Sequence, residues 1–254
     1  MTATVRKPGL LVDAVDVVKA FNSGSGQEPV TVLRGVSMTV TNGEMVAIVG
    51  PSGSGKSTLL YCLAGLEPLH SGKVELFGQD LASLGRNRLA KMRRDRIGFV
   101  FQSYNLIPSL TAAENAGLPG RLSRRRGAAE AARDSLRAVG LSERMRFLPG
   151  KLSGGQQQRV AIARVLASGA SLVFADEPTG ALDTRSGQQV LELLRETAAG
   201  DRSVVLVTHD LEAAARADRV LVLRDGQIHA ELITPTVEEV LESVRAAGDE
   251  AAAA

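Results

Sequence analysis

Apolar residues occur along this chain in short runs typical of β-strands. Residues 10–18 and 36–40 alternate between apolar and polar positions, as half-buried strands do. Other runs are nearly continuous, the pattern of strands that are buried on both faces in a parallel sheet; they are residues 45–49, 171–175 and 203–207. Two further strands are predicted at residues 73–77 and 97–101.

Turn and helix signals fill the intervals between these strands. Residues 219–224 and 227–232 flank Asp225-Gly226, a dipeptide favoured in β-hairpin turns. Helices are predicted where the pattern changes to a period of about 3.6 residues; they are residues 86–96, most of 111–168, the stretch from Asp183 to about 199, and 236–244. Residues 248–254, which end in four alanines, are predicted to be disordered.

Composition excludes several classes of protein. The 254 residues carry a net charge of +2, and the basic runs at 86–96 and 124–126 are interpreted as solvated surfaces, so no nucleic-acid partner is predicted. A single cysteine, Cys62, rules out a disulfide framework within the chain. Neither a signal peptide nor an apolar run of about 18 residues is visible. These features predict a cytoplasmic protein with no transmembrane helix.

The strongest chemical motif follows the strand at 45–49. Gly50, Gly55, Lys56 and Ser57 match the pattern Gly-x4-Gly-Lys-[Ser/Thr]. Glycines allow the backbone to curl so that its N–H groups point at a phosphate, and the helix that follows adds the positive end of its dipole. The lysine can reach the outer phosphates, and the serine hydroxyl can bind Mg²⁺. A glycine-rich turn with an unrelated lysine is the weaker interpretation, because a strand precedes this long motif.

Two other buried strands also end in residues that suit phosphate chemistry. Asp176 and Glu177 follow the run at 171–175, and buried carboxylates are costly unless they are used or paired. Asp176 suits the water shell of Mg²⁺, whereas Glu177 suits the activation of water. Surface acids that begin a turn are the alternative. His209 ends the run at 203–207, where open α/β sheets bind ligands; His70 and His229 are interpreted as surface residues.

Three further features have competing interpretations. Ser153 is a good N-cap for the helix that follows, but a cap alone would not require the glycines Gly154 and Gly155, which suggest a second anion-binding helix start. Phe21 ends a strand and suits either stacking on a nucleotide base or anchoring a small core. The apolar residues within 103–110 suggest either a docking surface or a locally packed loop.

In this order, these residues resemble the ATP-binding subunit of an ABC transporter over residues 10–233. The segment Leu152-Ser153-Gly154-Gly155-Gln156, together with the glycine loop, is the most specific part of the match. Residues 97–102 and Gln156-Gln157-Gln158-Arg159 are similar to the macrolide-exporter and lipoprotein-releasing branch. The resemblance implies an α/β fold, namely a P-loop NTPase core with a mostly parallel sheet, an antiparallel β subdomain and a helical subdomain.

The same resemblance implies a role for each site residue in a head-to-tail homodimer with ATP and Mg²⁺ as cofactors. ATP would be held by one chain through Gly50, Pro51, Ser52, Gly53, Ser54, Gly55, Lys56, Ser57 and Thr58, and capped by the other through Ser153, Gly154, Gly155 and Gln156. Mg²⁺ would be bound by Ser57, Gln102 and Asp176. Catalysis would depend on Lys56, on Gln102 as sensor, on Glu177 as general base and on His209 at the γ-phosphate. Asp183 would lie at the dimer seam, and Phe21 would contact adenine.

The resemblance also implies a partner and a domain plan. The chain would drive a separate membrane permease, docking near 103–110 at the cytoplasmic face of the membrane. Gating a membrane protein without transport, as in the control of cell-wall hydrolases, is an alternative; a soluble role in translation or DNA repair is a weaker one. The predicted plan is a flexible N-terminus at 1–9, the ATPase domain at 10–233 with a helical part at about 103–168, and a C-terminal helix and tail at 234–254.

Two departures from the family pattern are visible. Residues 114–126 are shorter and more basic than usual, and Gly117-Leu118-Pro119-Gly120 is expected to interrupt the helical pattern there. The loop at residues 22–31 is slightly long. The first departure affects the expected contact with the partner rather than the ATPase.

Overall fold

The computed structural model describes residues 9–22, 28–199 and 202–252. The chain divides into two compact units, a first unit made of Met1–Leu89 and Val205–Ala254 and a second unit made of Ala90–Val204. The division falls within helix α2 (Arg86–Arg96) and strand β8 (Ser203–Val207), both of which match the predicted elements. Most of the predicted flexible N-terminus, at residues 1–8, lies outside the described residues.

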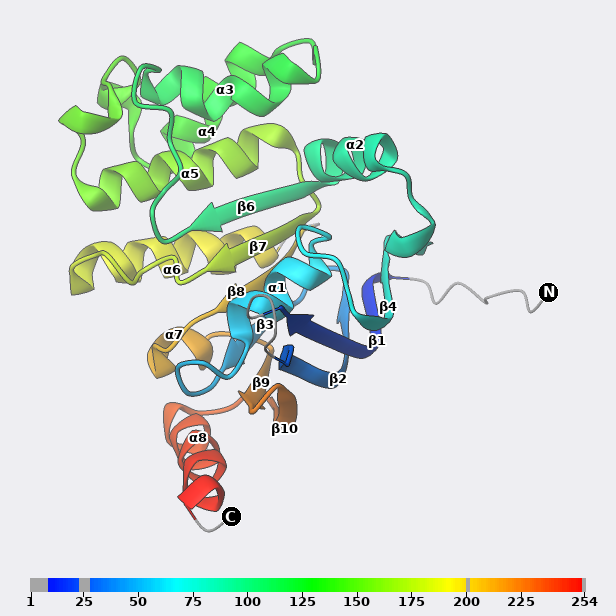
Figure 1. Cartoon of the computed structure of the whole chain (residues 1–254). Helices are drawn as coiled ribbons and strands as arrows, with labels where there is room; N and C mark the ends of the chain where they lie inside the picture. Colours follow the sequence, from blue (N-terminus) through cyan, green and yellow to red (C-terminus); the bar gives the residue numbers. More distant parts are fainter. Residues whose placement is uncertain (1–8, 23–27, 200–201, 253–254) are drawn as a thin grey trace. The chain divides into compact units, whose positions relative to one another are not determined.

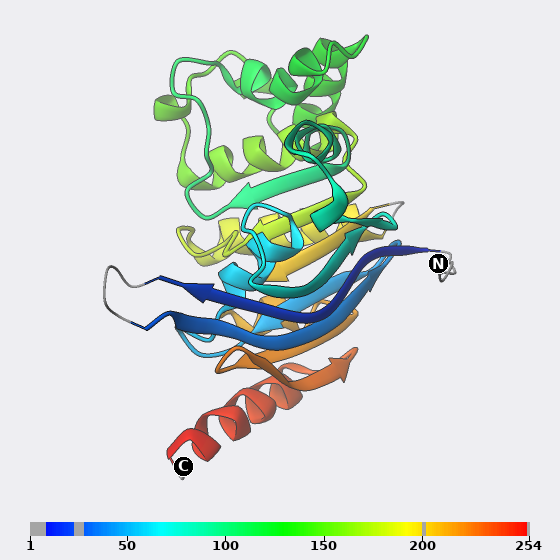
Figure 2. The ribbon, with the colours of Figure 1, turned by 45° about the vertical axis from the view of Figure 1, so that its right-hand side comes forward.

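An antiparallel sheet with the strand order β2-β1-β4-β5 forms one part of the first unit. Its strands are β1 (Leu10–Phe21), β2 (Val30–Thr41), β4 (Ser71–Leu76) and β5 (Gln79–Asp80). Figure 2 shows β1 and β2 as two long strands lying side by side. Phe21 pairs with Val30 at one end of this antiparallel pair. The prediction for β2 was too short, because pairing with β1 extends the strand well beyond its alternating segment. Of the predicted loop at 22–31, residues 23–27 lie outside the described residues.

A second group of strands in the first unit leads into the glycine loop. Strand β3 (Met45–Val49) pairs in parallel with β9 (Arg219–Arg224), which pairs antiparallel with β10 (Gln227–Ile233). Every residue of β3 is buried, as its continuous apolar pattern predicts. At the β9–β10 turn, Asp225 and Gly226 have φ values of 47° and 77°. Positive φ at both central residues is the geometry that this dipeptide favours, so the predicted hairpin is confirmed.

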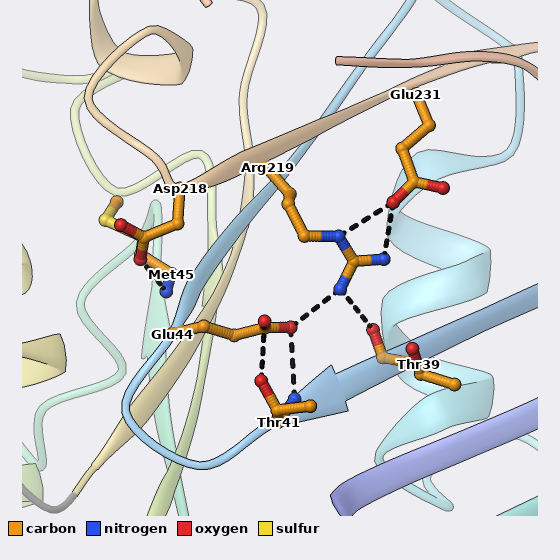
Figure 3. Close-up of polar contacts among 7 residues, drawn as sticks. All are labelled: Thr39, Thr41, Glu44, Met45, Asp218, Arg219 and Glu231. Atoms are coloured by element: carbon orange, nitrogen blue, oxygen red, sulfur yellow. Dashed lines mark hydrogen bonds and ion pairs between the residues drawn. The ribbon is translucent and has the colours of Figure 1, made fainter. Parts of the chain in front are cut away.

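An ion-pair network connects these strands to β2 (Figure 3). The Arg219 guanidinium donates to the Glu231 carboxylate at 2.7 Å, to Glu44 Oε1 at 2.8 Å and to the Thr39 carbonyl oxygen at 3.2 Å. Glu44 also accepts hydrogen bonds from the backbone N–H and hydroxyl of Thr41. Because one planar guanidinium serves three acceptors, Arg219 fixes the start of β9 against β2 and β10.

Helix α8 (Val237–Ala252) ends the first unit and is longer than predicted. Residues 248–252 are helical, which corrects the prediction that this stretch is disordered; residues 253–254 lie outside the described residues. Thr236 and Glu239 form reciprocal N-terminal capping bonds, and Val240 and Ala247 are fully buried. The helix packs against α7 (Leu211–Ala214), β9 and β10. Capping and packing therefore carry the helix through Gly248 and into the stretch that was predicted to be disordered.

The second unit combines a pair of parallel strands with helices. Strand β6 (Ile97–Phe101) pairs in parallel with β7 (Leu172–Asp176), as their apolar patterns suggest. Three helices pack against one another beside them (Figure 1), namely α3 (Ala112–Leu122), α4 (Ala128–Ala138) and α5 (Gly154–Ser168). Helix α6 (Thr184–Ala198) packs against α5 and matches the predicted amphipathic helix.

The expected interruption at Gly117-Leu118-Pro119-Gly120 is wrong, because α3 is continuous through these residues. The glycines are explained by close packing on α4. A Cβ atom on Gly120 would lie 2.7 Å from the Ala128 Cβ, and one on Gly117 would lie 3.3 Å from the Ala132 Cβ. Pro119 is accommodated within the helix. Tertiary packing overrides the low helix propensity of this segment.

Candidate functional site

The glycine loop lies between β3 and helix α1 (Lys56–Leu63), as predicted. Gly50, Gly53 and Gly55 have φ values of 150°, 83° and 99°, a region that favours glycine. Gly55 is the N-cap residue of α1, and no side chain caps the helix. At this helix start the backbone N–H groups of the first turn lie at the positive end of the helix dipole, a geometry that suits an anion. Lys56 Nζ donates to the carbonyl oxygens of Gly50 and Pro51, both at 2.9 Å, so the ammonium group lies over the loop.

The β9–β10 turn contacts the glycine loop and holds its backbone in place. The Gly226 N–H donates to the Ser54 carbonyl oxygen at 3.2 Å, and the Gly226 carbonyl accepts from the Arg34 N–H at 2.8 Å. A Cβ atom on Gly50 would lie 1.9 Å from the Leu223 carbonyl oxygen, which is far too close for any other residue. Within the described residues, the buried Ser54 Oγ has no hydrogen-bond partner. The loop is thus a backbone cradle with a buried hydroxyl, which fits a phosphate ligand.

Two other predicted site residues belong to the first unit. Phe21 is 40% exposed, and Lys19 Nζ lies 4.5 Å from the centre of its ring. The ring is therefore outside the core, which disfavours the core-anchor interpretation. His209 is exposed and directly follows Thr208, whose N–H donates to the Ile48 carbonyl oxygen in β3 at 3.2 Å. This bond brings His209 to the edge of β3 from which the glycine loop leaves.

Cys62, on α1, has no place in this chemistry. Its side chain is buried, and burial raises the pKa of the thiol to about 11. A thiol with so high a pKa is almost entirely protonated at neutral pH and is a poor nucleophile. This agrees with its interpretation as a small buried residue. The other two histidines, His70 and His229, are exposed, as the sequence suggests.

In the second unit, Gln102, Asp176 and Glu177 meet at one edge of the parallel strands. Phe101 pairs with Asp176, so Gln102 and Glu177 are the next residues of neighbouring strands. Glu177 has a φ of 47°, an unusual value for a residue with a side chain. The turn after it closes through a hydrogen bond from the Gly180 N–H to the Glu177 carbonyl oxygen at 3.1 Å. Gln102 Nε2 lies 2.8 Å from the point that a Cβ on Gly180 would occupy, which places the amide against this turn.

Ser153 is the N-cap of α5, as the sequence suggests, and it forms a capping box with Gln156. Ser153 Oγ accepts from the Gln156 N–H at 3.3 Å, and Gln156 Oε1 accepts from the Ser153 N–H at 3.0 Å. The two glycines between them are explained by packing. A Cβ on Gly154 would lie 2.7 Å from the Tyr104 hydroxyl oxygen, and one on Gly155 would lie 2.7 Å from the Ser186 side chain. The glycine pair therefore has a structural reason as well as a possible role in binding an anion.

Asp183 has an identifiable local role at the start of α6. Its carboxylate is exposed and accepts a hydrogen bond from the Ser186 N–H at 3.0 Å, which caps the helix. This bond lowers the pKa of the Asp183 carboxyl group, because it favours the charged form. The carboxylate is therefore held at the surface, beside the Ser186 that contacts Gly155.

Residues 103–110 form a surface loop whose backbone is held by hydrogen bonds, rather than a locally packed core. Of its apolar residues, Ile107 is 40% exposed, and none is buried. The fully buried Asn115 side chain accepts from the Ile107 N–H and donates to the carbonyl oxygens of Ile107, Leu110 and Thr111. Arg164 donates to the carbonyl oxygens of Tyr104 and Asn105. These bonds fix the backbone and leave the apolar side chains accessible.

Sequence reasoning did not assign roles to the residues that hold these loops in place. They are Asn115, Gln158, Arg164 and Gly226. Three of them bind backbone groups through their side chains, and the fourth does so through its own N–H. Asn115 and Gln158 lie at inward positions of their helices, and both are fully buried in the structure. A polar residue at such a position was the signal that could have found them. Buried amides have hydrogen-bond partners, but the sequence does not reveal which.

The glycine loop, the uncapped α1 and the acids at a strand end define the class of P-loop nucleotide-binding proteins. Comparison with known proteins narrows the class. The family model described as ABC transporter matches residues 33–180. An uncharacterized ABC transporter ATP-binding protein of Thermotoga maritima is 47% identical over 225 residues, which cover 86% of this chain and 93% of that protein. The chain belongs to the ABC transporter family; it has the ABC ATPase fold and is an ATPase.

Other relatives are longer than this chain. The macrolide export ATP-binding/permease protein MacB of Hyphomonas neptunium is 48% identical over 223 residues, covering 86% of this chain and 34% of that protein. The chain thus spans about a third of the length of the MacB relatives it matches. A solved structure of the ATP-binding cassette MJ0796, a dimer in a post-hydrolysis state bound to ADP and Pi, has a TM-score of 0.81 at 38% identity. That alignment covers 89% of this chain and 100% of the solved chain.

Proposed function

We propose that this chain is the ATP-hydrolysing subunit of a transporter, that it works as a head-to-tail homodimer, and that it drives a separate membrane permease. The observation that carries the proposal is the occurrence of two glycine-containing helix starts in one chain, at α1 and α5, each of which suits an anion. One nucleotide needs one phosphate cradle, so the second start is available to the nucleotide of another copy. The MJ0796 cassette, which is similar to this chain and forms a dimer, supports the dimeric part of the proposal.

In this proposal each group acts at a defined part of ATP. The backbone N–H groups of residues 50–58, apart from Pro51, surround the phosphates, Lys56 neutralises their charge, and Phe21 stacks on adenine. Ser57, Asp176 and Gln102 bind Mg²⁺, and their oxygen donors are the kind that this ion prefers. Bound Mg²⁺ would withdraw charge from the β- and γ-phosphate oxygens. Ser153, Gly154, Gly155 and Gln156 contact the nucleotide of the other copy, and Asp183 lies near the seam.

The chemical step is the in-line attack of water on the γ-phosphorus. The water oxygen forms a bond to phosphorus while the bond to the β–γ bridging oxygen breaks, which releases ADP and phosphate. Glu177 accepts the proton of the attacking water, and Gln102 orients that water. His209 donates a hydrogen bond to a γ-phosphate oxygen as charge shifts during the reaction. Asp176 and Glu177 are adjacent yet have different tasks: Asp176 is the last residue of β7, whereas Glu177 begins the turn after it with a φ of 47°.

The membrane partner and the location are further parts of the proposal. Among the described residues, no helix is long and apolar enough to cross a membrane. The MacB relatives are named ATP-binding/permease proteins, and this chain aligns with about a third of their length. We infer that a permease docks on the exposed side chains of 103–110, which holds the chain at the cytoplasmic face of the membrane. Extraction of a substrate from the membrane and export across it are both compatible with this arrangement.

The shared ATP site is tested by mixing two defective protomers. Neither Lys56→Ala nor Ser153→Arg homodimers should trap ATP when both also carry Glu177→Gln. In a mixed dimer, one site combines intact Lys56 from one chain with intact Ser153 from the other. We therefore expect about one trapped ATP per mixed dimer after crosslinking and purification. Trapping in neither the mixture nor the homodimers, while Glu177→Gln alone traps ATP, would contradict the head-to-tail arrangement.

The support of the glycine loop by the β9–β10 turn gives a prediction for nucleotide affinity. A Cβ on Gly226 would lie 2.2 Å from the Val32 carbonyl oxygen, so Gly226→Ala must displace the turn that bonds to Ser54. We expect the Kd for ATP to rise by about tenfold or more, which is about 1.4 kcal/mol. Gly35→Ala is the matched control, because Gly35 has a similar φ of 86° but no atom within 4 Å of the added Cβ.

Fluorescent ATP titration measures both affinities, and thermal unfolding measures the strain that each substitution adds. We expect both variants to lose stability, because both place a Cβ at positive φ, and Gly226→Ala to lose more, because its Cβ also clashes with the Val32 carbonyl oxygen. The loss of affinity should be confined to Gly226→Ala. Equal Kd values for the two variants would show that the turn does not shape the loop.

A further inference from the structure

Helix α5 contains a polar side chain that the proposed reaction does not use. Gln158 has no exposed surface, although it lies only two residues after Gln156 in the first turns of the helix. Its Nε2 donates to the Pro178 carbonyl oxygen at 2.7 Å. Within the part of the chain that the structure describes, its Oε1 has no hydrogen-bond partner. A purely space-filling position would favour an apolar side chain of the same length, because an unsatisfied buried amide oxygen is costly.

The acceptor of this bond belongs to the residue directly after Glu177. Pro178 is buried, and Glu177 has a φ of 47°. A residue with a side chain is held in this region only when its surroundings determine the backbone. Two bonds do so here, the Gly180 N–H to the Glu177 carbonyl oxygen at 3.1 Å and the Gln158 amide to Pro178. The first closes the turn on itself, whereas the second anchors the turn to α5.

Helix α5 contacts the same segment at two more points. The position of a Cβ on Gly154 is 3.5 Å from Leu182 Cδ2, and that of a Cβ on Gly155 is 2.7 Å from the Ser186 side chain. The first two turns of α5 therefore run along the chain from Pro178 to Ser186. Of these three contacts, the one made by Gln158 lies next to Glu177. It is a directional hydrogen bond, whereas the two glycine contacts are close packing.

We propose that Gln158 is a positioning residue for Glu177. Its amide holds the Pro178 carbonyl and with it the backbone that aims the Glu177 carboxylate at the attacking water. The inference rests on the proposed role of Glu177 as the general base. It also ties the position of that base to α5, the helix whose first turn we propose contacts the nucleotide of the other copy. Gln158 itself touches neither substrate nor water.

Gln158→Met tests this role, because methionine keeps the length of the side chain and loses the donor. We expect kcat to fall by about tenfold to a hundredfold, since small displacements of a catalytic group have effects of that size. KM for ATP should stay within about twofold. The melting temperature should change by no more than about 3 °C, because the variant also removes the unsatisfied Oε1. Gln158→Leu is a second variant without the donor, for use if methionine does not pack.

Gln157→Met is the matched control. Gln157 is the neighbouring glutamine, and its Nε2 donates to the Leu152 carbonyl oxygen at 3.1 Å rather than to the turn after Glu177. It should retain kcat within about twofold. A double variant then separates positioning from a general effect. In a Glu177→Gln background, Gln158→Met should cause no further loss of the single-turnover rate, because its target is already gone.

The outcomes are distinct. A normal kcat for folded Gln158→Met or Gln158→Leu overturns the inference and leaves the proposed function intact. A further loss of the single-turnover rate when Gln158→Met is added to Glu177→Gln also overturns the inference, because Gln158 would then act independently of Glu177. Normal turnover by Glu177→Gln alone would instead remove Glu177 from its proposed role, and the inference would fall with it.

Discussion

Glu177→Gln is expected to bind ATP with near-normal affinity and to lose about 10²–10⁴-fold of its hydrolysis rate, the usual contribution of a general base. The substitution preserves the size and shape of the side chain but replaces a proton acceptor with an amide. Glu177 directly follows β7, and the turn that it begins is closed by the Gly180 N–H and anchored by Gln158. Since these contacts are to the backbone, the substitution should leave the turn unchanged.

The same variant is expected to accumulate as a dimer with ATP bound, because hydrolysis is the step that would release the two copies. Steady-state phosphate release gives the rate, and size-exclusion chromatography with ATP and Mg²⁺ gives the oligomeric state. Glu192→Gln is a suitable control, since Glu192 is an exposed acid on α6 in the same unit. It should hydrolyse ATP normally and stay mostly monomeric. Near-normal phosphate release by Glu177→Gln would exclude it as the base.

The elements that the sequence predicts well are those whose pattern depends on local rules. Continuous apolar runs gave β3, β7 and β8, and the Asp225-Gly226 dipeptide gave the hairpin, because burial on both faces and a turn with positive φ leave few alternatives. The glycine loop was predicted for a similar reason. Its glycines are required by φ values and by close approach of the backbone, as at Gly50.

The errors occurred where packing overrides local preference. Glycine is a poor helix former in isolation, so Gly117 and Gly120 suggested a break, and the stretch that begins at Gly248 was predicted to be disordered. In the structure, the first two allow α3 to approach α4, and the third lies in a helix held by the burial of Val240 and Ala247. Such compensation depends on which helix lies opposite, and this is not encoded in the neighbouring residues.

The residues that position the candidate site were missed for a related reason. Asn115, Gln158 and Arg164 bind carbonyl groups that are 5, 20 and 60 positions away in the chain, respectively. A backbone carbonyl carries no signal in the sequence, because every residue has one. Chemical groups that contact a substrate can thus be predicted from residue type and spacing, whereas the groups that hold them in place require the tertiary structure.

Ile107→Asp is expected to abolish association with the permease while leaving ATP binding by the isolated chain unchanged. The apolar side chains of 103–110 would fill a groove contact with a cytoplasmic helix of the permease, and a few buried anchors dominate the energy of such contacts. A carboxylate placed in that contact would be desolvated without a partner. Leu106→Asp, a change at a partly buried neighbour, should have the same effect.

The structure explains why this substitution should be tolerated by the fold. The backbone N–H and carbonyl of Ile107 are both bonded to the Asn115 side chain, so the loop conformation does not depend on the Ile107 side chain, which is 40% exposed. Leu122→Asp is the control, an equivalent change at a residue on α3 that is 66% exposed and outside the proposed contact.

Co-expression with the cognate permease, followed by affinity purification through that permease, measures the association. The ATPase rate and melting temperature of each isolated variant are measured in parallel. We expect the wild type and Leu122→Asp to co-purify with the permease. Ile107→Asp should be absent from the purified complex but should retain its own ATPase activity and melting temperature. Full co-purification of Ile107→Asp would place the docking surface elsewhere.

The proposed docking loop is also connected to the proposed magnesium site. Gln102 begins this loop and directly follows Phe101, the residue of β6 that pairs with Asp176. A permease bound to 103–110 would therefore act directly on that site.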